Sequence, residues 1–389
     1  MQLIASSTVV TGTSGPEPRA LTLAIEDGRI VDLREGIDPQ AVAIEGWIVP
    51  GFVDTHCHGA AGADFSATDP QAVASAIDHH RRHGSTTLFA STVTESMDEV
   101  IAQIGRLRPL VESGELAGIH LEGPFLSEAK KGAHNPELLA DPSSDRVGRI
   151  LDAAQGSVRM ITLAPEREHG VEATARFVQA GVAVAFGHSD GDHIVTRECI
   201  DSGASVATHL FNAMRPVHHR DPGPIPVLLD DQRVMVELIC DGTHLHPDVI
   251  AMAIDAAGIH RVALITDAMS ATGQPDGDYD LGTLQVRVID GVAKILHEDG
   301  ALGAIAGSTL TMAGAVEFVV STVGMEIGEA AIMAATTPAR WHGLDRVGRL
   351  EPGCLADLCI LDDEGHLLQV MRQGSWLEGV DQDWGDDDE

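Results

Sequence analysis

The sequence predicts an α/β fold: a (β/α)8 barrel that carries a small β-sandwich domain built from both chain termini. Three observations predict it. Between residue 51 and about residue 340, apolar segments typical of buried strands alternate with helical patterns. The apolar segments recur roughly every 20 to 40 residues, which leaves room for one strand, one helix and two loops. Eight strands can be assigned in this way, and no GxGxxG motif follows the first, which favours a closed TIM-type barrel over an open doubly wound sheet.

The chain begins with short strands separated by turns, which predicts the first part of the small β domain over residues 1–50. Residues 344–380 repeat this pattern, and we expect them to pair with the N-terminal part. The barrel is expected over residues 51–343, with a β-hairpin insertion near residues 276–298 after the eighth strand. Residues 381–389 are mostly acidic and predict a solvated tail.

A helix is predicted over Asp69–His83, because Asp69 can cap it, Pro70 suits its first position and Gly84 can end it. The histidines of this helix lie away from the strand ends, and we expect them on a solvated face. The strand that precedes His56 opens the barrel. The seven strands that follow are predicted at Thr86–Ala90, Leu116–Leu121, Val158–Leu163, Val182–Phe186, Ser205–Leu210, Val234–Cys240 and Val262–Thr266.

Composition and charge exclude several classes of function. Lysine and arginine number 25 against 59 aspartates and glutamates, a formal net charge of −34, so nucleic acids and anionic membranes are unsuitable partners. Aromatic residues make up 3 %, so the chain has few rings on which the bases of single-stranded nucleic acid could stack. No apolar run reaches the roughly 18 residues that a membrane span requires. The five cysteines are scattered and predict no disulfide framework, and no signal peptide is evident, so we expect a cytoplasmic protein.

Polar side chains close the predicted strands, at the end of a barrel where chemistry is built. His56 and His58 follow the first strand and leave the same face of an extended chain, because successive side chains alternate. Other strands end in imidazoles or carboxylates, at Glu122, His188, His209, His244 and Asp267. One such histidine alone is ordinarily a hydrogen-bonded core or loop residue, but the whole set predicts a metal site. Nitrogen and oxygen ligands suit Zn, Fe, Ni or Co and leave a position for water.

Several longer segments carry a more specific signal. They are Asp54–Gly59, His120–Phe125, Lys131–His134, Gly187–Ser189, Thr208–Met214, Arg220–Gly223, Leu264–Asp267 and Ala306–Met312. Together they resemble the amidohydrolase superfamily, and within it the family of N-acetylglucosamine-6-phosphate deacetylases. The similarity covers nearly the whole chain, and the barrel with a small β domain that it implies agrees with the organisation above.

The resemblance implies roles for individual residues. Glu122, His188 and His209 match the principal metal ligands of the family, and His56 with His58 matches the first-strand pair of the superfamily. One or two divalent ions per subunit are expected, Zn before Fe, Co, Ni, Mn or Cd. Asp267 matches the catalytic acid and base. Substrate contacts are implied at Ala133, His134, Asn212, Ala213, Arg220, Asp241, His244, Ile305, Ala306 and Gly307.

The activity that the resemblance implies is hydrolysis of N-acetyl-D-glucosamine 6-phosphate to D-glucosamine 6-phosphate and acetate by metal-activated water, in amino-sugar catabolism and cell-wall recycling. In a chain this acidic, the cations that bind the phosphate must be local. Arg220, and with it His244, is expected to reach the neighbouring site of a homodimer. A solvated surface position is the alternative for Arg220, and a loop position for His134 and His244.

Three lysines, Lys130, Lys131 and Lys294, are the only ones in the chain, and none ends a predicted strand. This excludes the carbamylated lysine that bridges two metals in dihydroorotase-like members, so Glu122 must supply that carboxylate. A related amidohydrolase acting on N-acetylgalactosamine 6-phosphate or on an N-acyl amino acid is the alternative enzyme. A non-catalytic scaffold is a further alternative, disfavoured because every expected ligand position is filled.

Overall fold

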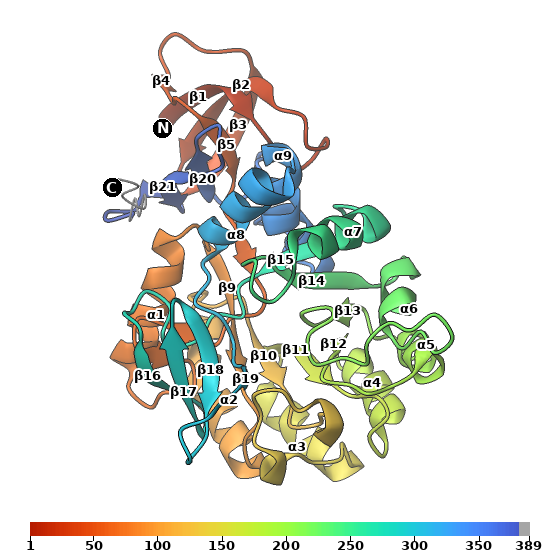
Figure 1. Cartoon of the computed structure of the whole chain (residues 1–389). Helices are drawn as coiled ribbons and strands as arrows, with labels where there is room; N and C mark the ends of the chain where they lie inside the picture. The colour runs from red at the N-terminus through yellow and green to blue at the C-terminus, as the bar shows by residue number, and fades with distance from the viewer. Residues whose placement is uncertain (381–389) are drawn as a thin grey trace. The chain divides into compact units, whose positions relative to one another are not determined.

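The computed structural model describes residues 1–380, and the acidic tail expected at 381–389 lies outside the described residues. Within the described chain, residue contacts divide the protein into two compact units. One contains residues 54–77 and 88–310, and the other contains residues 1–53, 78–87 and the chain from Thr311 onward. Figure 1 shows the course of the chain through both. The terminal unit therefore includes segments that the sequence assigns to the barrel.

The first unit is built around eight parallel strands that follow one another in the order of the sequence. They are β6 (Val53–Asp54), β9 (Thr87–Thr92), β10 (Gly118–Glu122), β11 (Val158–Leu163), β12 (Ala183–Phe186), β13 (Val206–Ala207), β14 (Met235–Ile239) and β15 (Val262–Ile265). The (β/α)8 barrel predicted from the sequence is thereby confirmed. β13 is shorter than the predicted Ser205–Leu210, because the backbone turns into the left-handed region at His209, which ends the strand.

The barrel closes just beyond the ends of its first and last strands. Cys57 and Ala268 form a parallel bridge, and the Asp267 amide donates to the His56 carbonyl oxygen over 2.8 Å. The Thr266 hydroxyl also donates to the fully buried Asp54 carboxylate over 2.7 Å. Closure therefore brings the histidine pair after the first strand next to the aspartate after the eighth.

Helices connect the strands, as parallel pairing requires. They are α1 (Pro70–Arg82), α2 (Met97–Glu112), α3 (Ser144–Ala154), α4 (Gly170–Gln179), α5 (His193–Asp201), α6 (Ile225–Asp230) and α7 (Pro247–Ala257). α1 has the predicted bounds within one residue at each end, and the Asp69 carboxylate accepts from the amide of Gln71. Its histidines do not all face solvent. His80 is fully buried, because it continues the inward row of Val73 and Ile77 at helical spacing.

The insertion after β15 is larger than the hairpin predicted near 276–298. It is an antiparallel sheet of four strands, β16 (Gly277–Leu281), β17 (Leu284–Ile289), β18 (Val292–Leu296) and β19 (Leu302–Ile305). The predicted hairpin corresponds to β17 and β18. β16 has two aspartates and a glycine among its five residues, so its sequence carries little strand signal. Val286 and Ala306 belong to the small core that this sheet buries.

The second unit joins the two ends of the chain in one sheet of eight strands. These are β1 (Gln2–Val9), β2 (Arg19–Glu26), β3 (Arg29–Glu35), β4 (Val42–Ala43), β5 (Trp47–Pro50), β20 (Leu358–Leu361), β21 (Leu367–Arg372) and β22 (Ser375–Trp376). β5 pairs antiparallel with β20, which joins the N-terminal strands to the C-terminal strands as expected. The unit also contains α8 (Met312–Phe318), α9 (Ile327–Ala331) and α10 (Thr337–Trp341).

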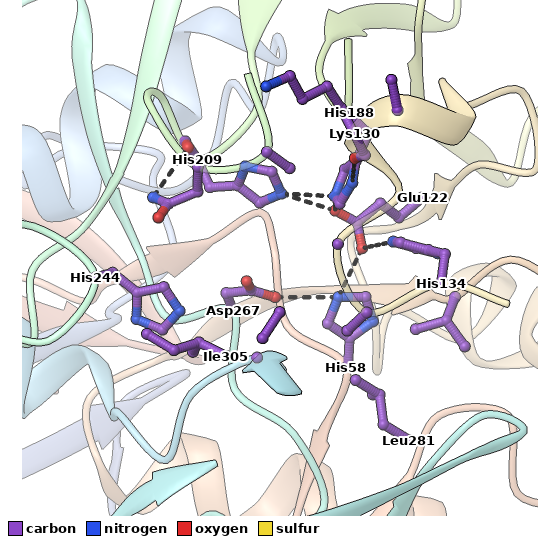
Figure 2. Close-up of a pocket in the computed structure, with 18 residues that line it drawn as sticks. His58, Glu122, Lys130, His134, His188, His209, His244, Asp267, Leu281 and Ile305 are labelled. Carbon is purple, nitrogen blue, oxygen red and sulfur yellow. Dashed lines mark hydrogen bonds and ion pairs between the residues drawn. The ribbon is translucent and has the colours of Figure 1, made fainter. Parts of the chain in front are cut away.

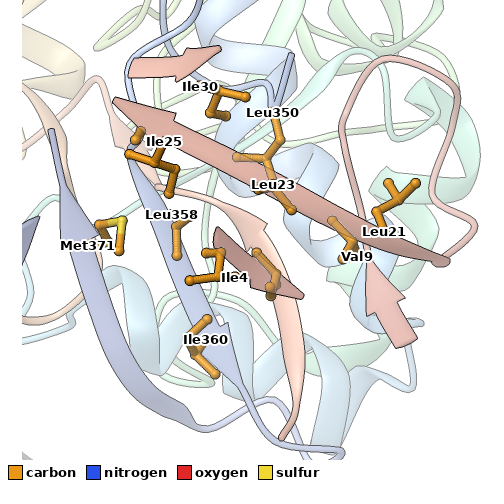
Figure 3. Packing of buried hydrophobic residues seen from close by; sticks show 12 residues of the cluster. Ile4, Val9, Leu21, Leu23, Ile25, Ile30, Leu350, Leu358, Ile360 and Met371 are labelled. Carbon is orange, nitrogen blue, oxygen red and sulfur yellow. The ribbon is translucent and has the colours of Figure 1, made fainter. Parts of the chain in front are cut away.

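An aliphatic cluster from both chain ends fills this unit, including Ile4, Leu23, Ile30, Leu358 and Met371 (Figure 3). Each of these five side chains is at most 1 % exposed. The chain has eleven methionines but only one tyrosine, and branched aliphatic residues supply most of this core. Burial of each such side chain stabilises the fold by roughly 1.5–3 kcal/mol.

Leu23→Ala is expected to lower the free energy of unfolding by about 2–5 kcal/mol, because it leaves a cavity among close-packed neighbours. Denaturant unfolding followed by circular dichroism measures the change. Val31→Ala on the adjacent β3 is the control, since that side chain is 44 % exposed. Equal effects of the two substitutions would contradict this description of the core.

Candidate active site

Glu122, the last residue of β10, is the centre of the site and is 4 % exposed. Its Oε1 lies 3.1 Å from His188 Nε2 and 3.0 Å from His209 Nε2, and these two nitrogens are 3.0 Å apart. His188 follows β12 and His209 follows β13. The separations approach the roughly 3.3 Å expected between ligands of a tetrahedral ion bound at about 2.0–2.1 Å.

A second group of ligand atoms lies on the other side of the Glu122 carboxylate. His58 Nε2 is 3.2 Å from His56 Nε2, 3.1 Å from Asp267 Oδ1 and 3.2 Å from Glu122 Oε2. His56 Nε2 is also 3.4 Å from Asp267 Oδ1. One carboxylate thus faces both groups, through different oxygens (Figure 2).

Hydrogen bonds to backbone and carboxylate oxygens orient two of these imidazoles. His188 Nδ1 lies 2.9 Å from the Lys130 carbonyl oxygen, and His56 Nδ1 lies 3.3 Å from Glu237 Oε2. Both oxygens accept, so each Nδ1 is a donor and each Nε2 is the ring nitrogen directed at the site. The residues present fit a bound metal ion, because imidazole nitrogens and carboxylate oxygens converge. Burial lowers the pKa of His58, but Asp267 and Glu122 outweigh it and raise this pKa to about 9, so a metal ion bound here would displace a proton from the imidazole.

The backbone itself turns these side chains inward. His188, His209 and Asp267 have φ values of 47°, 29° and 50°, in the left-handed region that non-glycine residues rarely adopt. Each follows the last residues of a barrel strand. Gly307 has φ 65°, and a methyl group there would lie 3.0 Å from the Asp267 carbonyl oxygen. Glycine at this position lets the chain pass close to Asp267.

Burial and charge set the protonation of the groups between these ligands. Burial raises the pKa of the Asp267 carboxyl, but His56 and His58 outweigh it and lower this pKa to about 2. Burial also lowers the pKa of His134 to about 4, although Glu122 opposes the shift. The Thr94 amide donates to His134 Nδ1, so neutral His134 carries its proton on Nε2, 3.4 Å from Glu122 Oε2. Asp267 is therefore an acceptor and His134 a donor.

A cavity of about 350 Å³ opens over both ligand groups. Twelve residues predicted from the sequence line it, namely His58, Glu122, Ala133, His134, His188, His209, Asn212, Ala213, His244, Asp267, Ile305 and Gly307. Figure 2 shows Asp267 between His244 and His58, with its carboxylate directed at His58. These twelve residues lie at or just beyond the ends of six barrel strands, in the segment after β10 and at the end of β19.

Four predicted site residues lie elsewhere. His56 is fully buried and does not line the cavity. Asp241 also stays outside it and accepts from His244 Nδ1 over 2.7 Å, so it orients that imidazole and raises its pKa against the effect of burial. Ala306 is buried in the core of the four-stranded sheet, whereas Ile305 and Gly307 on either side of it line the cavity. Arg220 is exposed, and its guanidinium contacts His219.

Sequence reasoning missed six residues that line the cavity: Val93, Ala129, Lys130, Gly132, Leu281 and Ala304. It also missed Glu237 on β14, which is fully buried and accepts from Thr55 as well as from His56. A glutamate inside the apolar run of β14 was the available signal, because buried carboxylates are ordinarily paired.

The eight-stranded barrel and the imidazole and carboxylate ligands at its strand ends define a metal-dependent hydrolase. The model of the amidohydrolase family matches residues 47–377. The chain belongs to the amidohydrolase family, and it is an enzyme that hydrolyses carbon–nitrogen bonds.

Three proteins illustrate its similarity to known members. N-acetylgalactosamine-6-phosphate deacetylase of Escherichia coli O157:H7 is 36 % identical over 84 % of this chain and 86 % of that protein. N-acetylglucosamine-6-phosphate deacetylase of Lysinibacillus sphaericus is 33 % identical over 96 % and 97 %. A solved structure shows the D267A mutant of N-acetyl-D-glucosamine-6-phosphate deacetylase from Mycobacterium smegmatis in complex with N-acetyl-D-glucosamine-6-phosphate. Its sequence is 43 % identical to this chain, and the two structures superpose with a TM-score of 0.91. The superposition covers 96 % of this chain and 98 % of the Mycobacterium smegmatis chain.

Proposed function

We propose that this enzyme hydrolyses N-acetyl-D-glucosamine 6-phosphate to D-glucosamine 6-phosphate and acetate, in amino-sugar catabolism and cell-wall recycling. The observation that carries the proposal is the place of the Asp267 carboxylate, 3.1 Å from His58 Nε2, beside two groups of metal-ligand atoms in a cavity of about 350 Å³. Similarity to deacetylases of N-acetylhexosamine 6-phosphates over most of the chain supports it.

Glu122, His188 and His209 would hold one divalent ion, and His56, His58 and Asp267 would hold a second. Glu122 faces both groups, which favours two ions per subunit over one. Zinc is the metal we expect, because imidazole and carboxylate ligands suit it. A divalent ion bound here would acidify water and polarise the acetamide carbonyl group.

Asp267 acts as base and then as acid. Its carboxylate accepts a proton from water as the new carbon–oxygen bond forms at the acetamide carbon. It then delivers this proton to the amide nitrogen as the carbon–nitrogen bond breaks, which yields the amine and acetic acid; the acid releases its remaining proton to give acetate. Its pKa of about 2 means that Asp267 is ionised at neutral pH and has a carboxylate oxygen to which a proton can be transferred.

Neutral His134 donates from Nε2 toward the acetyl oxygen, since its other nitrogen is occupied by the Thr94 amide. His244, oriented by Asp241, binds the sugar or its phosphate from the other side of Asp267. Asn212, Ala213, Ile305 and Gly307 complete the walls around the sugar. Asp241 contributes by orienting His244, and Ala306 by anchoring Ile305 and Gly307 to the core of the four-stranded sheet.

Arg220 supports the proposal of a homodimer, because it is exposed and outside the pocket of its own chain. In that arrangement it reaches the phosphate bound by the partner subunit. We also infer a cytoplasmic location, since the five cysteines, all of them described, form no disulfide. None of the helices among residues 1–380 is long and apolar enough to cross a membrane.

Acetate release from four compounds tests the proposal: N-acetylglucosamine 6-phosphate, its galactose epimer, unphosphorylated N-acetylglucosamine and an N-acetyl amino acid. We expect the first to have the highest kcat/KM, at least about tenfold above the unphosphorylated sugar, because charged hydrogen bonds to phosphate are lost without it. The relative from Escherichia coli makes N-acetylgalactosamine 6-phosphate the second candidate. Preference for the N-acetyl amino acid would overturn the proposal.

A further inference from the structure

Among the residues that line the cavity, those that carry or can carry a charge are two carboxylates, five histidines and one lysine. Of the lysines and arginines among residues 1–380, Lys130 alone lines it. Arg220, expected at the phosphate from sequence, is outside the cavity of its own chain. A dianionic phosphate that enters beside Glu122 and Asp267, in a chain of net charge −34, needs a local cation.

The backbone around Lys130 is fixed from both sides by one residue of the site. The Ser127 amide donates to the His188 carbonyl oxygen over 2.9 Å, and His188 Nδ1 donates to the Lys130 carbonyl oxygen over 2.9 Å. Lys130 ends the short 3-10 turn Glu128–Lys130 that lies between these bonds. Its Cα position is thus set by the same histidine that faces Glu122.

The ammonium group of Lys130 is held only loosely. Its Nζ is 3.8 Å from Asp190 Oδ1, at a site where the lysine is 24 % exposed and the aspartate 40 % exposed. Such a pair contributes little to stability. Asp190 also accepts from Arg215 over 3.3 Å, so it keeps a cation when Lys130 turns away.

The segment that carries Lys130 borders a part of the wall where substrate contacts are implied. A methyl group at Gly132 would lie 3.7 Å from the Ala213 side chain, so this segment runs beside Asn212 and Ala213. Figure 2 shows Lys130 next to His188, at the opposite edge of the pocket from Leu281.

We propose that Lys130 binds the phosphate of the substrate within its own subunit and so determines the preference for phosphorylated sugars. The inference rests on the proposed function and adds a residue that sequence reasoning did not assign to the site. Lys130 leaves Asp190 for the phosphate oxygens when substrate binds, and no covalent bond changes. Arg220 of a partner subunit and Lys130 would then approach the same phosphate from different chains.

Lys130→Ala tests this, with Lys131→Ala as the matched control. Lys131 is the adjacent residue, carries the same charge and does not line the cavity. KM and kcat are measured with N-acetylglucosamine 6-phosphate and with N-acetylglucosamine, and inhibition by inorganic phosphate is measured in parallel. We expect Lys130→Ala to raise KM for the phosphorylated sugar, and Ki for inorganic phosphate, about tenfold or more. The unphosphorylated sugar and the Lys131→Ala variant should remain near wild type, and Lys130→Arg should restore most of the affinity.

A Lys130→Ala enzyme that keeps wild-type KM and Ki overturns the role of Lys130 and leaves the proposed function standing. Equal losses with both sugars also overturn it, because they indicate a damaged site. Wild-type enzyme that does not distinguish the two sugars overturns the phosphate selectivity of the proposed function together with this inference.

Discussion

Replacing Asp267 by asparagine is expected to reduce kcat by about 10²–10⁴-fold while leaving KM within a few-fold of wild type. Asparagine has nearly the same shape and can adopt the left-handed backbone found at this position, but it cannot accept the proton of water. The His188, His209 and Glu122 group is untouched, so one bound ion should remain.

Kinetics of acetate release and a count of bound metal per chain check the Asp267→Asn result. Asp248→Asn is the control, because this aspartate side chain is 93 % exposed at the start of α7. Wild-type kcat in Asp267→Asn would remove Asp267 from the reaction. Loss of all metal would instead show that Asp267 is a ligand that both metal ions require.

Replacing Glu122 by glutamine is expected to remove both metal ions and with them nearly all activity. The Glu122 carboxylate lies within 3.2 Å of His188, His209 and His58, so both ligand groups lose their shared anion. Burial raises the pKa of Glu122, but the surrounding imidazoles outweigh it and hold this pKa well below its usual range. The Glu122 side chain is therefore an anion in the wild-type protein, whereas glutamine is neutral.

Elemental analysis of purified Glu122→Gln, followed by activity measured over a series of zinc concentrations, distinguishes it from Asp267→Asn. Excess zinc should restore part of the activity of Glu122→Gln and none of the activity of Asp267→Asn. Glu128→Gln, an exposed position on the same segment, should bind metal as wild type does. Two tightly bound ions in Glu122→Gln would contradict the shared-ligand geometry.

The sequence predicted the site best where an apolar strand pattern ends in a polar residue. Apolar runs identified the barrel strands, and the polar residues at or just beyond their ends supplied the candidates Glu122, His209 and Asp267, because the carboxyl ends of all strands lie at one end of a parallel barrel. Buried partners such as Glu237 are harder to find, since their meaning depends on a strand distant in the sequence.

Other features depend on geometry that a pattern does not contain. Lys130 and Lys131 are identical neighbours in the sequence, yet only the fold places one of them in the cavity wall. Ala306 and Ile305 are likewise adjacent, and only the fold shows that Ile305 lines the pocket while Ala306 is buried in the core beside it. The expected role of Arg220 concerns a second chain and stays a prediction.

The left-handed backbone at His188, His209 and Asp267 links activity to thermal tolerance. Each such conformation costs of order 1–3 kcal/mol, which the rest of the fold must offset. Glycine substitutions at these positions would relieve the backbone strain and raise the free energy of unfolding, but they would also remove the side chains that bind metal and transfer protons. Selection for heat resistance alone would therefore favour inactive variants, and any engineering programme on this scaffold needs an activity screen at every round.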